Sequence, residues 1–264
     1  MPSPTAEPER HYYRDTAGPW TPRAALSGPK AARVCIVGAG LAGLNTALGL
    51  VERGERDVVV LEAGTVGHGA SGRNGGFVFA GYSRGEAALL ADLGPVRAKA
   101  LYQRTRDAVA LVRARSERYA IDCDRVDGGV LWANWFRDPT VLEARRRLLR
   151  DHFDTEWSAV DAESLRDRLK TTRYTGALFE PQAFHFHPLK YVRGVVAALE
   201  RSGAAVHEAS GVTALRRAGQ GWRVQTASGH VDAEQVVLAC GGYLAGLVPR
   251  VDAAVLPIAT YVMV

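Results

Sequence analysis

The apolar positions of residues 33–62 follow the order of a βαβ unit. The buried-type run 33–37 leads into Gly38-Ala39-Gly40-Leu41-Ala42-Gly43, then an apolar helix over 44–53 and a second apolar strand over 57–61. Continuous apolar runs of this length, joined through a helix, are typical of parallel strands that are buried on both faces. The second strand ends at Glu62, nineteen residues after Gly43. This spacing is that of a dinucleotide-binding site.

The glycine positions have a physical explanation within such a site. Gly38 permits a tight turn after the strand, Gly40 lets a pyrophosphate approach the backbone, and Gly43 lets the helix pack on the strand. A diphosphate would lie at the helix N-terminus, where unpaired N–H groups and the macrodipole favour an anion. Glu62 would accept hydrogen bonds from a ribose, and its charge argues against a 2′-phosphate and hence NADP. A glycine turn that serves only packing remains the alternative.

The pattern changes between Gly76 and Pro188, where simple βα repetition stops. Helical spacing predicts one short and one long helix within 86–119, and further helices at 141–153, at 162–169 with Asp161 as N-cap, and at 188–201 before Gly203. Strands are predicted at 128–135, 176–179, 205–208, 212–216, 222–226 and 236–240. We therefore expect an α/β protein, a Rossmann-like domain into which an incomplete α+β region is inserted.

Composition removes several other classes of protein. The chain has 264 residues, 47% hydrophobic residues and 28 glycines, which suits an α/β enzyme. The net charge of +5 is not gathered into a block, and no basic and aromatic stripe suggests nucleic-acid binding. Cys35, Cys123 and Cys240 form no C-x-x-C motif, and Asp122 and Asp124 have no partner at metal-ligand spacing. We therefore expect no disulfide framework and no metal site.

The sequence also shows neither a membrane span nor a secretory signal. The apolar stretch 34–51 is interrupted by four glycines, so a βα unit explains it better than a membrane span. Residues 1–30 carry six prolines among charged residues and lack the apolar region of a secretory signal. We expect these residues to form an extended arm that Tyr12, Tyr13 and Trp20 attach to the globular surface. A cytoplasmic location follows as an expectation, with no membrane partner.

A second glycine-rich stretch, Gly67-His68-Gly69-Ala70-Ser71-Gly72-Arg73-Asn74-Gly75-Gly76, carries the most specific resemblance. Together with the arm 11–17, the glycine turn, the motif 61–63, His187-Pro188, Gly211-Val212 and the run 237–243, it resembles the FAD-dependent amine and amino-acid oxidoreductases of the D-amino-acid oxidase superfamily. Within that superfamily the chain resembles the gamma-glutamylputrescine oxidoreductase branch. The resemblance covers essentially the whole chain.

The resemblance implies FAD as the cofactor and assigns residues to it. The glycine turn 38–43, Glu62 and Ala63 would hold the ADP half, and the backbone at Val212 would meet the adenine. Ser71, Gly72, Arg73, Asn74, Gly75 and Gly76 would pass the pyrophosphate and the flavin ring, where larger side chains would collide. Ala239, Cys240 and Gly241 would close over the cofactor. Arg73 would balance diphosphate or reduced-flavin charge, unless it forms an ordinary surface ion pair.

The implied reaction oxidises a C–N bond of an amine or amino acid by hydride transfer to flavin N5, and the imine then hydrolyses. Oxygen or another acceptor would reoxidise the flavin. No catalytic residue can be assigned, because His185 and His187 are more simply cap or packing residues before Pro188. Two alternatives remain open at this point. One is an NAD-linked dehydrogenase, and the other is a non-catalytic, truncated remnant of a flavoenzyme.

The resemblance also divides the chain. We expect an arm over 1–30, the first part of the FAD-binding domain over 31–85 and the first part of a substrate domain over 86–183. The second part of the FAD-binding domain would cover 184–250, and 251–264 would begin a truncated return to the substrate domain. Family members continue beyond this point, so a fragment is expected. Residues 255–264 are predicted to form a strand that pairs with 128–135.

Overall fold

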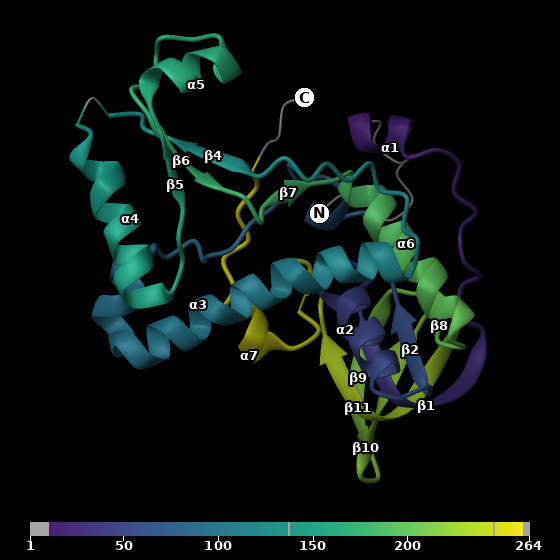
Figure 1. The fold of residues 1–264 in the computed structure, drawn as a ribbon. Coiled ribbons are helices and arrows are strands. Elements are labelled where there is room, and N and C mark those ends of the chain that lie inside the picture. Colours follow the sequence, from purple (N-terminus) through teal and green to yellow (C-terminus); the bar gives the residue numbers. More distant parts are fainter. Residues whose placement is uncertain (1–10, 137, 245, 261–264) are drawn as a thin grey trace. The chain divides into compact units, whose positions relative to one another are not determined.

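The fold is described by a computed structural model over residues 11–136, 138–244 and 246–260 (Figure 1). Within these ranges the chain forms two compact units. The first contains residues 11–75, 119–123 and 187–260, and the second contains 76–118 and 124–186. The predicted domain boundaries at 85/86 and 183/184 remain predictions, because compact units are not in themselves independently folding domains.

The first unit is built on a six-stranded mixed sheet with the order β8-β2-β1-β11-β10-β9. Its strands are β1 (Gly28–Val37), β2 (Val58–Leu61), β8 (Ala205–His207), β9 (Val212–Ala218), β10 (Gly221–Thr226) and β11 (Gly229–Leu238). Strands β8, β2, β1 and β11 are parallel, whereas β10 and β9 continue the sheet antiparallel. The helical segments are α1 (Tyr12–Thr16), α2 (Leu41–Glu52), η1 (Ala70–Gly72), α6 (Pro188–Arg201) and α7 (Pro249–Asp252). The α/β fold class is thereby confirmed.

The parallel strands form the core of this unit. Every residue of β2 is buried, and so are the last four residues of β1. Cys35 and Val59 belong to one core cluster with Val224 of β10 and Val231 of β11. Helix α2 packs against α6, and both carry buried apolar faces. Burial of β1 and β2 on both sides explains why their sequences are continuous apolar runs.

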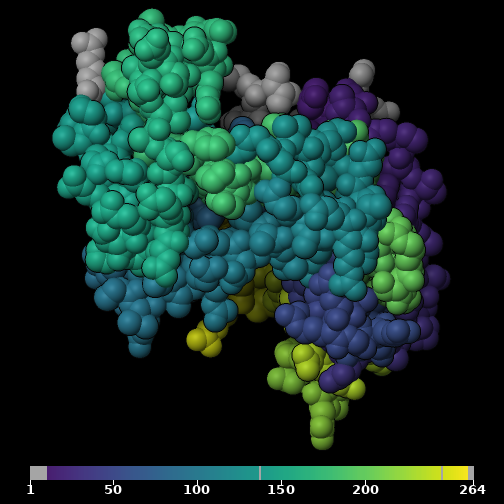
Figure 2. All heavy atoms as spheres, viewed as in Figure 1, coloured from purple at the N-terminus to yellow at the C-terminus, as the bar shows by residue number. Residues whose placement is uncertain are grey.

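The second unit combines helices with short antiparallel strands. Its elements are β3 (Phe77–Val78), α3 (Glu86–Arg118), β4 (Val130–Ala133), α4 (Thr140–Phe153), β5 (Ser158–Val160), α5 (Ala162–Leu169), β6 (Ala177–Glu180) and β7 (Phe184–His185). One sheet has the order β4-β6-β5, and β3 pairs with β7. Helix α3 packs against α4, and the spheres of the two helices adjoin one another in Figure 2.

Two details of this unit confirm predictions about helix ends. Helix α3 is interrupted at Gly94, which has φ 72° and precedes Pro95, so the predicted short and long helices are present. Asp161 caps α5, because its carboxylate accepts a hydrogen bond from the Ser164 N–H at 2.8 Å. Both helix limits follow from the chemistry of single residues. Gly94 adopts a positive φ that favours glycine, and Asp161 supplies a side-chain acceptor for a backbone N–H.

Two expectations need correction. The arm is not extended throughout, because α1 forms one helical turn. The arm is also shorter than expected, because residues from Gly28 onward belong to strand β1 of the sheet. Tyr12 is 53% exposed, and its ring centroid lies 5.4 Å from that of Tyr13 in an edge-on contact. Residues 255–260 form no strand, and β4 pairs with β6 instead. The rest of that predicted strand, residues 261–264, lies outside the described part of the chain. None of the described helices is both long and apolar enough to cross a bilayer.

Candidate functional site

The first glycine turn connects β1 to α2 and allows very little space. Gly38 has φ 108°, and a Cβ there would lie 2.6 Å from the Ala239 carbonyl oxygen. A Cβ at Gly43 would overlap with the Gly38 carbonyl oxygen. Glycine is therefore required at both positions to let α2 start directly beside the ends of β1 and β11.

The second glycine-rich stretch meets the first at the N-terminus of α2. Ser71 accepts a hydrogen bond from the Leu41 N–H, with the Ser71 Oγ 2.8 Å from the nitrogen. A Cβ at Gly40 would lie 2.6 Å from the same Oγ. Gly40 is the N-cap, and the first turn contains no acidic residue. The fold thus brings the two glycine-rich motifs, whose contacting residues are thirty positions apart, to one helix terminus. The partial positive charge of this terminus suits a diphosphate.

Glu62 lies at the carboxyl end of β2, next to this terminus. One carboxylate oxygen accepts from the Ala39 N–H at 2.8 Å, and the other accepts from the Gly64 N–H at 3.0 Å. The side chain remains partly exposed. Ala63 follows it and faces Gly211, where a Cβ would lie 3.5 Å from that of Ala63. Val212 starts β9 immediately afterwards. The predicted ribose and adenine residues are therefore neighbours.

The segment after β11 completes this edge of the sheet. The Ala239 N–H donates to the Val37 carbonyl at 2.8 Å, and the Cys240 Sγ lies 3.5 Å from the same oxygen. Burial raises the pKa of the Cys240 thiol, so it stays protonated at neutral pH. Gly241 has φ 57°, a conformation that favours glycine. These residues border the glycine turn, and their predicted contact with the cofactor stays a prediction.

The second stretch itself is partly explained by contacts within the protein. Gly67 has φ 71°, and a Cβ there would lie 2.8 Å from Val192 Cγ2 of α6. A Cβ at Gly72 would overlap with the Gly67 carbonyl oxygen and lie 3.0 Å from Leu189 Cδ1. Gly67 and Gly72 are thus required by packing against α6, a reason that the sequence had not indicated. Asn74 donates to the Ala70 and Ser71 carbonyls at 3.1 Å.

The remaining residues of the stretch and the histidines are placed as follows. Arg73 lines a pocket between α1 and α6, and Gly75 ends the first of the three segments that form the first unit. The Gly76 carbonyl accepts from the Phe186 N–H at 3.0 Å. His187 caps α6, because its Nδ1 accepts from the Lys190 N–H at 3.2 Å. His187 is therefore a cap, in keeping with its position before Pro188.

The described residues offer neither a reactive strand thiol at Cys35 nor a metal site. Burial raises the pKa of Cys35 to about 12, which keeps this strand thiol neutral. Cys123 is also buried. No group of His, Cys, Asp or Glu side chains in the described ranges could hold a metal ion.

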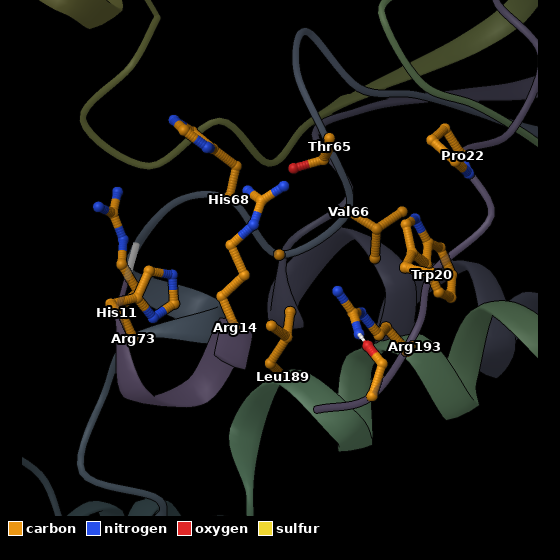
Figure 3. A pocket seen from close by; sticks show the side chains of 12 residues that line it. His11, Arg14, Trp20, Pro22, Thr65, Val66, His68, Arg73, Leu189 and Arg193 are labelled. Carbon is orange, nitrogen blue, oxygen red and sulfur yellow. Dashed lines mark hydrogen bonds between the residues drawn. The ribbon is translucent and has the colours of Figure 1, made fainter. Parts of the chain in front are cut away.

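Sequence reasoning missed a buried carboxylate and a pocket in the first unit. Glu208, 1% exposed, follows β8 and accepts hydrogen bonds from Trp20 Nε1, the Arg23 N–H and the Val66 N–H. It fixes the arm to the loop after β2. A cavity of about 190 Å³ lies between that loop, α1 and α6 (Figure 3). The only sequence signal for Glu208 was an acidic residue at the end of a predicted strand. The pocket has no sequence signal, because its lining residues come from distant segments.

The residues at the α2 terminus fit the ADP half of FAD. Gly40 leaves the helix end without a side chain, and the cradle there is one that a Cβ would fill. Glu62 stands beside it with a partly exposed carboxylate for a diol. The helix end supplies N–H donors and the carboxylate supplies an acceptor, which is the polarity that a diphosphate and a ribose need.

Comparison with known proteins agrees with this geometry. The family model "FAD dependent oxidoreductase" matches residues 33–264. Gamma-glutamylputrescine oxidoreductase of Escherichia coli strain K12 is 35% identical over 253 residues, which cover 96% of this chain and 59% of that protein. A probable oxidoreductase OrdL of Haemophilus influenzae is 29% identical over 260 residues, which cover 96% of this chain and 60% of that protein. The crystal structure of glycine oxidase from Geobacillus kaustophilus has a TM-score of 0.67 and 25% identity, covering 84% of this chain and 58% of that one.

The fold and the site define a flavoprotein whose first unit is Rossmann-like. The chain belongs to the FAD dependent oxidoreductase family, and its cofactor is FAD. It spans about three fifths of the length of the curated relatives named here.

Proposed function

We propose that the protein oxidises a C–N bond of a small amine or amino acid, with FAD as hydride acceptor, at a cytoplasmic location. The observation that carries this proposal is the hydrogen bond from the Leu41 N–H to Ser71 Oγ, 2.8 Å long. It joins both glycine-rich motifs at one helix terminus. An NAD-linked dehydrogenase needs only the first motif, and family membership further supports the flavoprotein alternative.

When bound, FAD supplies the hydride acceptor at flavin N5, and the imine product is released as carbonyl and amine after attack by water. This chain's residues bind and orient. The α2 terminus at Gly40 and Leu41 would face the diphosphate, and Glu62 would accept from the ribose. Ala63 and Val212 would border the adenine. Ser71 to Gly76 and Ala239 to Gly241 would line the remainder. Oxygen or another acceptor would reoxidise the cofactor.

The substrate class rests on the relatives. One is a gamma-glutamylputrescine oxidoreductase and another is a glycine oxidase, so both amines and amino acids occur among them. The described residues include no assigned catalytic side chain. A dedicated base is not required where binding selects the neutral amine. The protein would then contribute orientation and electrostatics.

The first test is spectroscopic. The purified 264-residue chain, reconstituted with FAD, should absorb between about 350 and 500 nm after removal of free cofactor. Titration of the apoprotein with FAD then gives the affinity. A colourless protein that does not change on titration would contradict cofactor binding by this chain. Amine-dependent peroxide release, or reduction of an artificial acceptor, would test turnover separately.

Variants locate the site. Gly40→Val should abolish FAD retention, because its side chain would occupy the pyrophosphate approach. Since a Cβ at Gly40 also meets Ser71 Oγ at 2.6 Å, the double variant with Ser71→Ala is needed. Loss of FAD that persists there is due to the blocked approach, whereas recovery would assign the effect to the Ser71 clash. Unchanged affinity in Gly40→Val would refute the site.

Glu62→Ala should weaken FAD binding by about 1–3 kcal/mol, as expected when a charged hydrogen-bond acceptor is lost. Glu55→Ala is the matched control, since Glu55 is another largely buried carboxylate of the same βαβ unit but pairs with Arg33. Glu55→Ala should leave the affinity unchanged. An equal loss in both variants would show a general effect on the fold.

A further inference from the structure

The pocket of the first unit has an unusual set of side chains. It is lined by residues from α1 and the arm, from the loop after β2 and from α6 (Figure 3). Those that carry or can carry positive charge are His11, Arg14, His68, Arg73 and Arg193. Of the described residues that line it, none is acidic. Three arginines around a cavity of about 190 Å³ make a positive potential that an anion would relieve.

Arg193 is held at this pocket from one side. Its Nη1 donates to the Gly18 carbonyl at 3.0 Å and lies 3.4 Å from the Ala17 carbonyl, and its guanidinium lies 5.1 Å from the centre of the Trp20 ring. Its Nε is buried and has no hydrogen-bond partner among the described residues. An unpaired buried donor on a cation is costly, so it indicates a missing acceptor.

Among the described residues, the charges around Arg193 are balanced only in part. Burial lowers the pKa of Arg193, and the charge of Arg14 lowers it further, with partial compensation by Glu208. Glu208 cannot serve as the missing partner, because its two oxygens already accept from Trp20 Nε1, the Arg23 N–H and the Val66 N–H. The same contacts hold the arm in place and so keep the pocket formed.

We propose that this pocket is a binding site for a small oxyanion, a carboxylate or a phosphate, held by Arg14 and Arg193. A guanidinium presents paired N–H donors that match either group. Gly40, Leu41, Glu62 and Ser71 of the proposed FAD cradle do not line this pocket, and Arg73 is the residue assigned to FAD that borders it. Arg14 and Arg193 are not among the residues assigned to FAD. A volume of about 190 Å³ suits an anion with a short carbon chain and is too small for a nucleotide. The ligand is therefore a metabolite-sized anion separate from the cofactor.

The test is calorimetric titration of the 264-residue chain, with and without bound FAD, in low-chloride buffer. Inorganic phosphate and succinate are the two probes. We expect one site per chain for at least one probe, with an unchanged affinity when FAD is bound. Tighter binding of phosphate would assign a phosphoryl ligand, and tighter binding of succinate a carboxylate. Arg14→Gln and Arg193→Gln should each weaken that binding at least tenfold.

Controls separate a specific site from general effects. Arg216→Gln changes an exposed arginine of β9 in the same unit and should have no effect. Arg14→Lys keeps the charge and should retain part of the affinity, and thermal melting verifies that each variant folds. The proposal is overturned if neither probe binds, if Arg216→Gln weakens binding as much as Arg14→Gln, or if bound FAD displaces the probe. Displacement would show that the pocket belongs to the cofactor, and a failure of FAD binding alone would leave the anion site standing.

Discussion

Replacement of Glu208 by glutamine should release the arm from the first unit. The two carboxylate oxygens each accept from a different backbone group, the Arg23 N–H at 2.5 Å and the Val66 N–H at 2.6 Å. Trp20 Nε1 lies 3.1 Å from both. A glutamine amide has only one oxygen, so either orientation turns its NH₂ group toward one of the two backbone donors. No rotamer of the amide can satisfy both.

The expected magnitude follows from these contacts. One hydrogen bond to a charged acceptor is lost, which is worth about 1.5–3 kcal/mol, and the remaining ones become neutral. Val66 is 2% exposed, so its N–H would be left without water if the amide turned toward it. We expect local opening of the arm to become easier by about 2–4 kcal/mol. This corresponds to amide exchange roughly 30 to 1,000 times faster.

Hydrogen–deuterium exchange at residues 20–26 and 65–68 measures this opening, and trypsin cleavage after Arg23 provides a second readout. Glu200→Gln is the matched control, because Glu200 binds the guanidinium of the same Arg23 at 2.7 and 2.9 Å but its side chain is 37% exposed. An exposed pair contributes little, so exchange should change by less than about tenfold. Equal exchange in Glu208→Gln and the unmodified protein would refute the assignment of Glu208 as the residue that fixes the arm.

Two further predictions concern other parts of the fold. Gly43→Ala should lower the urea midpoint of unfolding, because overpacking against the Gly38 carbonyl costs about 1–3 kcal/mol and exceeds the gain of about 0.5–1 kcal/mol in helix propensity. Gly85→Ala, at a glycine with open space, should change it little, and a stabilised Gly43→Ala would contradict the contact. Burial raises the pKa of Glu180, so the folded state binds the proton more tightly than the unfolded state does. The stability due to this group is full below its unfolded pKa of about 4.3 and is lost as pH rises through the folded pKa, so Glu180→Gln should remove that part of the pH dependence in urea titrations. A pH-independent difference between the two proteins would contradict it.

The sequence by itself determined the elements whose signals are local. Strands buried on both faces read as apolar runs, which located β2 and the end of β1. Asp161 and Gly94 set helix limits through a side-chain acceptor and a left-handed φ, both properties of single residues. The glycine turn and Glu62 were identified for the same reason, since each position of the motif has its own steric or polar requirement.

The tertiary structure alone decided what depends on contacts between distant segments. The first residues of β1 are extended because they pair with β11, two hundred residues later, although Gly28, Pro29 and Lys30 have no strand pattern of their own. Gly72 is needed for α6, and Glu208 meets donors 142 to 188 positions away in sequence. Arg14 and Arg193 share a pocket only because the arm returns to α6. Hydrogen bonding and burial of this kind depend on which surfaces fold together, and a linear pattern of polar and apolar residues does not carry that information.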